Sequence, residues 1–181
     1  MSTVRPLTDA DREAVLTLIT AHFAEERSYE VPENDERAGT YVRVAEREGE
    51  PVGVMALTTY DSRERVREAM HLVDTVEGVP PASTYGLVHA GYVAPAHTGT
   101  GIGSRLLERL HEIGDTNGVG VFVADAWFHG GPDSPADLLT THGYDVVSTD
   151  SIAGHADGPC PKCGTPCACE AALTVRAPTP E

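Results

Sequence analysis

Apolar residues along this chain alternate with polar ones, or run together, in short segments that predict β-strands. The run at residues 119–126 is almost wholly apolar, as expected for a strand buried on both faces. Residues 41–45 and 52–57 flank a turn at 48–51, which predicts a hairpin. The full set of predicted strands is 3–7, 41–45, 52–57, 85–93, 119–126, 144–148 and 171–175.

In three other segments the apolar residues recur every three or four positions, which predicts helices with one buried face, and the capping pattern Ser134-Pro-Ala-Asp137 predicts a fourth, short helix. The first helix begins at Thr8 or Asp9, where Asp11 completes a capping-box pattern with Thr8. The third follows a glycine-rich turn and ends near Gly114, and the fourth runs from Ser134 to Gly143. The predicted apolar faces are Val15, Leu18, Ile19 and His22/Phe23 in the first helix, Val66, Ala69, Met70 and Val73 in the second, and Ile102, Leu106, Leu110 and Ile113 in the third.

Strands and helices alternate in an order that predicts an α/β fold with three layers, helices on both sides of a mixed sheet. The polar segment 25–39, interrupted by Pro32, predicts a loop or a short irregular helix. The length of 181 residues is typical of one domain, so we expect a single domain over 1–181. A segment rich in Gly, Pro and Cys at 154–169 forms an insertion before the last strand.

The chain is strongly acidic, with 28 Asp and Glu against 13 Lys and Arg and a net charge of −15. This charge excludes a general nucleic-acid or anionic-membrane surface, since both need clustered cations. No apolar run is long enough to span a bilayer and no signal peptide is recognisable, so we expect a cytoplasmic protein. The acids are spread over the whole chain and Lys162 is the only lysine, a composition typical of proteins from salt-loving microbes such as haloarchaea.

The turn between the predicted strand 85–93 and the helix after it carries three glycines in five residues, Gly99, Gly101 and Gly103. Glycine lets a backbone approach a ligand closely, and the first amides of a helix lack partners within the helix. Together with the helix dipole, such a turn suits an anion such as a pyrophosphate. Glycine spacing alone is equally compatible with a tight turn that binds nothing.

The wider motif resembles the acetyl-CoA-binding segment of the GNAT superfamily of N-acetyltransferases. Tyr92-Val-x-Pro leads into Gly99-x-Gly-Ile-Gly103 and Leu106-Leu107, and the later Asp137 to Tyr144 is similar to the family's last helix and its Gly-Phe ending. The resemblance covers roughly residues 3–176. It implies a mixed, mostly antiparallel sheet splayed at its centre, with acetyl-CoA entering on one side and an amine on the other, and direct acyl transfer between them.

The resemblance also implies which residues hold acetyl-CoA. Backbone amides of residues 98–104 would bind the pyrophosphate, and the main chain at Val93, beside a bulge, would pair with the pantetheine arm. The implied cofactor-binding set is Tyr92, Val93, Thr98, Gly99, Thr100, Gly101, Ile102, Gly103 and Ser104.

Two positions depart from the family pattern. Thr98 stands where Arg or Gln usually begins the loop, so that position brings no charge. Leu139 stands where a tyrosine often serves as acid to the leaving thiolate. The second departure keeps open a catalytically degenerate member that binds acyl-CoA, or a zinc-stabilised interaction module.

An amine acceptor must lose a proton before it can attack, which requires a general base. His89, four residues before Val93 on the predicted strand and therefore expected on the same face as Val93, is one candidate, and a buried structural histidine is the alternative. Asp125, near the end of the following strand, is the second candidate, or it caps the turn at 129–131. Trp127 and Phe128 pack the acceptor pocket or the core.

All four cysteines lie within ten residues: Cys160, Cys163, Cys167 and Cys169. Cys-Pro-x-Cys-Gly is typical of a metal knuckle, and four thiolates suit a tetrahedral zinc with a structural role. Disulfides, unbound thiols and an iron–sulfur centre are the alternatives. The spacing is compact, so His155 could replace one cysteine as a metal ligand.

The single lysine in the cysteine-rich segment does not supply the positive charge that nucleic-acid binding would need. The expected partners are therefore acetyl-CoA and an amine, with a homodimer as the default assembly.

Overall fold

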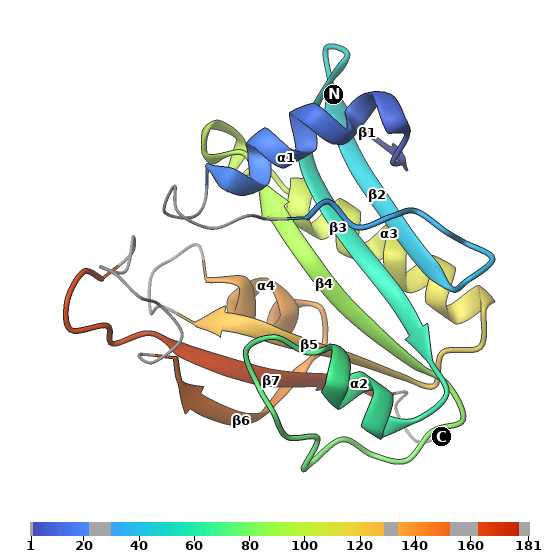
Figure 1. Ribbon diagram of the computed structural model, residues 1–181, viewed down its shortest axis with the longest axis vertical. Helices are drawn as coiled ribbons and strands as arrows, with labels where there is room; N and C mark the ends of the chain where they lie inside the picture. The colour runs from blue at the N-terminus through green and yellow to red at the C-terminus, as the bar shows by residue number, and fades with distance from the viewer. Residues whose placement is uncertain (1, 22–29, 129–133, 153–162, 178–181) are drawn as a thin grey trace. The chain divides into compact units, whose positions relative to one another are not determined.

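The computed structural model describes residues 2–21, 30–128, 134–152 and 163–177 (Figure 1). Within these residues, seven strands form one sheet in the order β1-β2-β3-β4-β5-β7-β6. The strands are β1 Thr3–Pro6, β2 Thr40–Arg47, β3 Glu50–Tyr60, β4 Tyr85–Val93, β5 Val121–Phe128, β6 Asp145–Ser151 and β7 Glu170–Arg176. The helices are α1 Arg12–Thr20, α2 Arg63–Ala69, α3 Ile102–Thr116 and α4 Pro135–Thr141, with short 3₁₀ turns at Asp9–Asp11 and Pro95–His97.

The sheet is mixed and mostly antiparallel, which confirms the predicted α/β fold class. β1 with β2, β2 with β3, β5 with β7 and β6 with β7 pair antiparallel, whereas β4 and β5 pair parallel. The parallel pairing of β4 with β5 is short: it joins Tyr85–Leu87 to Val121–Val123. β1 and β6 are the two edges of the sheet. By its internal contacts the chain divides into two compact units, residues 1–58 with 88–116 and residues 59–87 with 117–181.

In the first unit, α1 covers one face of β2 and β3 (Figure 1). Cross-strand pairs Val42↔Ala56 and Val44↔Val54 point to this face and are fully buried against the helix. The helix contributes Val15, Leu18 and Ile19, as its apolar spacing predicts. Because side chains alternate along a strand, the next even-numbered pair, Thr40↔Thr58, lies on the same face beyond the apolar pairs.

The opposite face of the first unit packs on α3. A methyl group built on Gly53 would come within 2.9 Å of a side-chain carbon of Ile102 and 3.2 Å of one of Leu106. Glycine at position 53 therefore lets the helix approach β3 closely. The predicted apolar face of this helix is buried, and the helix continues through Gly114 to Thr116.

An ion-pair network joins the first strand to the capping turn of α1. Arg5 donates to both carboxylate oxygens of Asp11, at 2.7 and 2.8 Å, and to Glu46 at 2.6 Å. Asp11 also accepts hydrogen bonds from the amide and hydroxyl of Thr8, which confirms the predicted capping box. These hydrogen bonds, that of Arg5 foremost, hold the pKa of Asp11 well below its usual range.

The second unit has its own apolar cluster on one face of β5 and β7. Val66 of α2 packs there with Val123, Leu173 and Cys169. The helix predicted over 66–73 begins earlier and ends earlier than expected, because Met70 adopts an extended conformation after Ala69. Val73 is nevertheless buried in the cluster from the loop that follows, so its apolar character reflects core packing rather than a continuing helix.

β4 has the predicted bounds, and no other strand boundary differs from the predicted one by more than three residues. β5 runs from Val121 to Phe128. Just before the strand, the amide of Gly120 donates to the backbone carbonyl of Thr84. β6 is an edge strand whose side chains are mostly exposed, including Val146 and Val147. No helix in the described part of the chain has the length and apolarity that a bilayer-spanning segment requires.

Candidate functional site

The glycine-rich turn joins the end of β4 to α3 within the first unit. Gly99 and Gly101 have φ values of 74° and 78°, in the left-handed region that favours glycine. A methyl group built on either residue meets no atom within 4 Å. The backbone conformation therefore accounts for glycine at both positions, and the space beside them is open.

The amides of this turn fall into two groups. Thr98 donates its amide to the Pro95 carbonyl and Thr100 donates to that of His97, so these two amides maintain the turn. Within the described part of the chain, five other amides of the segment donate no hydrogen bond: Gly99, Gly101, Ile102, Gly103 and Ser104. Five donors around a helix start fit the oxygens of a pyrophosphate.

The side chains of the turn add little charge. Thr98 brings none, and the hydroxyl of Thr100 donates to the His97 carbonyl at 2.6 Å. Arg105, in the first turn of the helix, is exposed and donates to the Ser2 hydroxyl. The turn therefore offers backbone amides and the helix dipole as its main attraction for an anion.

His89 forms part of a row of polar side chains across three neighbouring strands. Its Nε2 atom lies 3.0 Å from the Thr58 hydroxyl, which lies 3.2 Å from the hydroxyl of Thr40. All three residues are half-buried. The sequence identified His89 as a candidate and did not identify the two threonines. The hairpin register could have done so, because it places them as a polar pair next to one valine–alanine pair and one valine–valine pair.

Ala90 explains how His89 reaches this row. It has a φ of 51°, an irregularity that interrupts the side-chain alternation of β4. Ala90 and Tyr92 pack on the α1 face, and His89 binds Thr58 on that face as well. The spacing of four residues therefore does not place His89 and Val93 on one face, contrary to our expectation from simple counting.

The second predicted base, Asp125, has a different environment in the second unit. One carboxylate oxygen accepts the backbone amides of His71 and Leu72, each at 2.7 Å. Burial raises the pKa of Asp125, while these amide bonds act in the opposite direction. The carboxylate thus holds the loop after α2 on β5. The turn at 129–131, its alternative partner, lies outside the described residues.

Two further residues of the sequence analysis lie in the second unit. Leu139 is buried in α4, so an aliphatic side chain, which cannot serve as an acid, occupies this position. Trp127 packs against the apolar cluster of the second unit, consistent with a core role.

Three cysteines of the predicted metal loop lie together at the start of β7. The Cys163 sulfur lies 3.7 Å from that of Cys167 and 3.4 Å from that of Cys169, and the Ala168 amide donates to Cys163 at 3.2 Å. These separations exceed the bond length of about 2.05 Å in a disulfide. They approach the spacing of about 3.8 Å that tetrahedral Zn–S bonds of about 2.3 Å impose. Cys160 and His155 lie outside the described residues.

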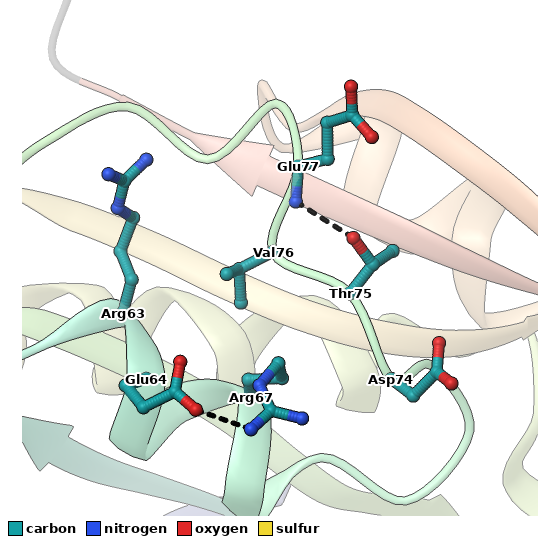
Figure 2. Close-up of a pocket in the computed structure, with 7 residues that line it drawn as sticks. All are labelled: Arg63, Glu64, Arg67, Asp74, Thr75, Val76 and Glu77. Carbon is teal, nitrogen blue, oxygen red and sulfur yellow. Dashed lines mark hydrogen bonds and ion pairs between the residues drawn. The ribbon is translucent and has the colours of Figure 1, made fainter.

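A surface hollow of about 580 Å³ lies between α2 and the following loop (Figure 2). Arg67 pairs with Glu64 on the helix, and the Glu77 amide donates to the Thr75 hydroxyl at 3.1 Å. Arg63 donates to the Val79 carbonyl at 2.9 Å. With two arginines and three carboxylates among its lining residues, the hollow favours no class of charged ligand.

Comparison with known proteins finds a family match over more than half of the chain. The sequence profile of the Acetyltransferase (GNAT) family matches residues 8–127, which include the glycine turn, His89 and Asp125. A search of curated protein sequences finds no match.

Solved structures similar to the chain share its fold over almost their whole length. Ribosomal-protein-alanine N-acetyltransferase from Brucella melitensis has a TM-score of 0.63 at 22% identity, with 97% of this chain and 99% of that chain covered. YncA from Salmonella typhimurium, solved with its cofactor acetyl-CoA, has a TM-score of 0.63 at 18% identity and 100% and 98% coverage. A GCN5-related N-acetyltransferase from Kribbella flavida has a TM-score of 0.63 at 20% identity, with 98% of each chain covered.

Proposed function

Because the chain belongs to the acetyltransferase (GNAT) family, we propose that it transfers an acetyl group from acetyl-CoA to an amine by direct attack of that amine. The observation that carries the proposal is the group of five amides without internal partners at the glycine turn. Acetyl-CoA supplies an activated thioester, so the protein needs only to hold the thioester, orient the amine and accept its proton.

The residues of the turn fit the phosphates of such a cofactor. Gly99, Gly101, Ile102, Gly103 and Ser104 would donate amides to the pyrophosphate, and Thr98 could add its hydroxyl. Tyr92 and Val93, at the end of β4, would carry the pantetheine arm along the main chain. A protein with a net charge of −15 then binds an anion through local dipoles rather than through its overall field.

We assign the general base to His89 in preference to Asp125. The imidazole is half-buried, and imidazole titrates near neutral pH, which suits proton abstraction from an ammonium. The Asp125 carboxylate already accepts two amides at 2.7 Å, and this structural role competes with proton transfer. A base within hydrogen-bond reach of the amine typically contributes a factor of about 10² or more.

The test is turnover of acetyl-CoA with a panel of small amines, peptides with basic residues and protein N-termini. CoA should be measured by chromatography, because the four cysteines of the chain would react with a thiol reagent. We expect CoA release with at least one amine, and we expect His89→Gln to lower kcat by about 10²-fold. Asp125→Asn should keep most of kcat and lower the thermal stability instead, because the amide oxygen accepts a weaker hydrogen bond.

The same measurement separates two outcomes that contradict the proposal. If the unaltered protein binds acetyl-CoA and releases no CoA with any amine, it is an acyl-CoA-binding module, the reading favoured by the buried aliphatic Leu139. If turnover proceeds and His89→Gln leaves kcat unchanged, the base lies elsewhere.

We propose that Cys163, Cys167 and Cys169, with Cys160 or His155 as fourth ligand, hold a structural zinc ion. The support is the clustering of three sulfur atoms within 4.8 Å of one another and the amide donated to Cys163. Zinc would supply a fixed tetrahedral link across the loop without redox chemistry. Such reduced thiols fit the cytoplasm, where disulfides are rare.

We also propose that the acidity reflects a saline cytoplasm. Raising KCl from about 0.1 M to about 1 M shortens the Debye length from about 10 Å to about 3 Å and screens the repulsion among carboxylates. We therefore expect the melting temperature to rise over this range in a calorimetric titration. A melting temperature that is highest in dilute buffer would contradict the proposal.

A further inference from the structure

The hydrogen-bonded row on the α1 face has a chemical consequence for His89. Thr40 and Thr58 follow two apolar cross-strand pairs on this face, at the place where valine would continue the buried pattern. Threonine and valine have nearly the same shape, so the difference that threonine brings at these positions is its hydroxyl group. Both hydroxyl groups are within hydrogen-bond distance of a neighbour in the row.

The direction of the hydrogen bonds follows from what a base requires. The Nε2 atom of His89 is occupied by its hydrogen bond with the Thr58 hydroxyl in either neutral tautomer. If His89 is the base of the proposed transfer, the lone pair that takes the substrate proton is therefore the one on Nδ1. Nε2 then carries the hydrogen and donates it to the Thr58 oxygen. That hydroxyl keeps its own hydrogen, which the Thr40 oxygen at 3.2 Å can accept.

We propose that Thr58, supported by Thr40, is a positioning residue that holds His89 in the tautomer with hydrogen on Nε2 and its basic lone pair on Nδ1. This inference rests on the proposed acetyl transfer for its catalytic meaning. When Nδ1 takes a proton from the amine, the bond from Nε2–H to Thr58 becomes charge-assisted and strengthens. The row therefore stabilises the imidazolium that forms as the amine attacks.

The bulge at Ala90 makes this arrangement possible. In a regular strand His89 would lie on the same face as Gly91, whose built methyl group meets Met55 on the other side of the sheet at 3.3 Å. The positive φ of Ala90 instead leaves His89 on the face of Thr58. The irregularity thus directs the ring toward the Thr58 hydroxyl, which the hairpin register has already placed beside that of Thr40.

The test compares Thr58→Val with Thr58→Ser in two measurements. In long-range ¹H–¹⁵N spectra at about pH 9, where an ordinary histidine is neutral, we expect the unaltered protein and Thr58→Ser to show the His89 ring hydrogen on Nε2. Thr58→Val should instead show ring ¹⁵N shifts averaged between the two neutral tautomers. In turnover, Thr58→Val should lower kcat about tenfold with KM for acetyl-CoA unchanged, and Thr58→Ser should retain kcat within about twofold.

Two variants complete the design. Thr40→Val should lower kcat in the same direction by a smaller factor, since it removes only the second hydrogen bond. Thr149→Val, on the exposed edge strand β6, makes the same substitution far along the chain and should leave kcat and the ring signal unchanged.

Failure of this inference differs from failure of the proposed function. A ring hydrogen on Nδ1 in the unaltered protein, or an unchanged Nε2–H signal in Thr58→Val, overturns the role of Thr58 whatever the turnover. If the spectra respond as expected and no amine is acetylated, Thr58 still sets the tautomer, and the assignment as an acetyltransferase fails instead.

Discussion

Replacing Gly101 by alanine is expected to raise the dissociation constant for acetyl-CoA by about tenfold. Gly101 has a φ of 78°, and its amide belongs to the five that donate no hydrogen bond within the described residues. An alanine there resists the left-handed conformation at a cost of about 1–2 kcal/mol and turns the amide away from the phosphate. One hydrogen bond to a charged group is worth about 1.5–3 kcal/mol, so its loss accounts for a tenfold change. Isothermal titration calorimetry measures the effect.

A matched control separates strain from ligand binding. Gly118 has a φ of 74°, and a methyl group built on it also meets nothing within 4 Å, yet it follows the C-terminal end of α3. Gly118→Ala therefore imposes the same backbone strain at a place remote from the turn in sequence. We expect both variants to lose similar thermal stability and only Gly101→Ala to lose affinity. Equal losses of affinity in the two variants would show that the turn does not bind the phosphates.

If the cysteines hold the proposed zinc ion, its removal is expected to destabilise the second unit by more than about 3 kcal/mol, because a structural zinc site contributes directly to folding. Cys169 is fully buried at the start of β7 and belongs to the apolar cluster that holds Val66, Val123 and Leu173. Its carbonyl also accepts the amide of Ile152 from the end of β6. Loss of the metal should therefore loosen β6 and β7, with a fall in melting temperature of about 10 °C.

The measurement is a thermal melt of protein with and without a chelator, together with zinc analysis of protein purified without one. Cys169→Ala provides the comparison: it should melt at the lower temperature and should no longer respond to the chelator. Zinc-free protein whose melting temperature equals that of the untreated sample would exclude a structural metal. Iron in the analysis, with visible absorbance, would indicate a cluster instead.

The sequence predicted those parts of the site whose conformation depends on residues close together in the chain. The glycine turn, its conformation and the helix that follows are encoded within about a dozen residues, and the spacing of the apolar residues in that helix identifies its buried face. The cysteines lie close together for the same reason, since Cys163, Cys167 and Cys169 are separated by a few residues in the chain.

The parts that sequence missed depend on contacts between distant segments. Thr58 meets His89 across 31 positions, and only because Ala90 departs from regular strand geometry. Asp125 meets the amides of His71 and Leu72 across more than 50 positions. The end of α2 at Ala69 was missed because the apolar residues beyond it are buried by the core rather than by a helix. Local periodicity carries no information on any of these contacts.

The exposed edge strand β6 gives the acidity of the chain a second meaning. An edge strand leaves hydrogen-bonding groups open to another chain, and Val146 and Val147 would favour such pairing. Asp145 and Asp150 flank these valines on the same strand, so two copies brought edge to edge would set carboxylates against one another. Such charges act as gatekeepers against aggregation. Part of the negative charge therefore protects the fold from self-association, independently of any ligand.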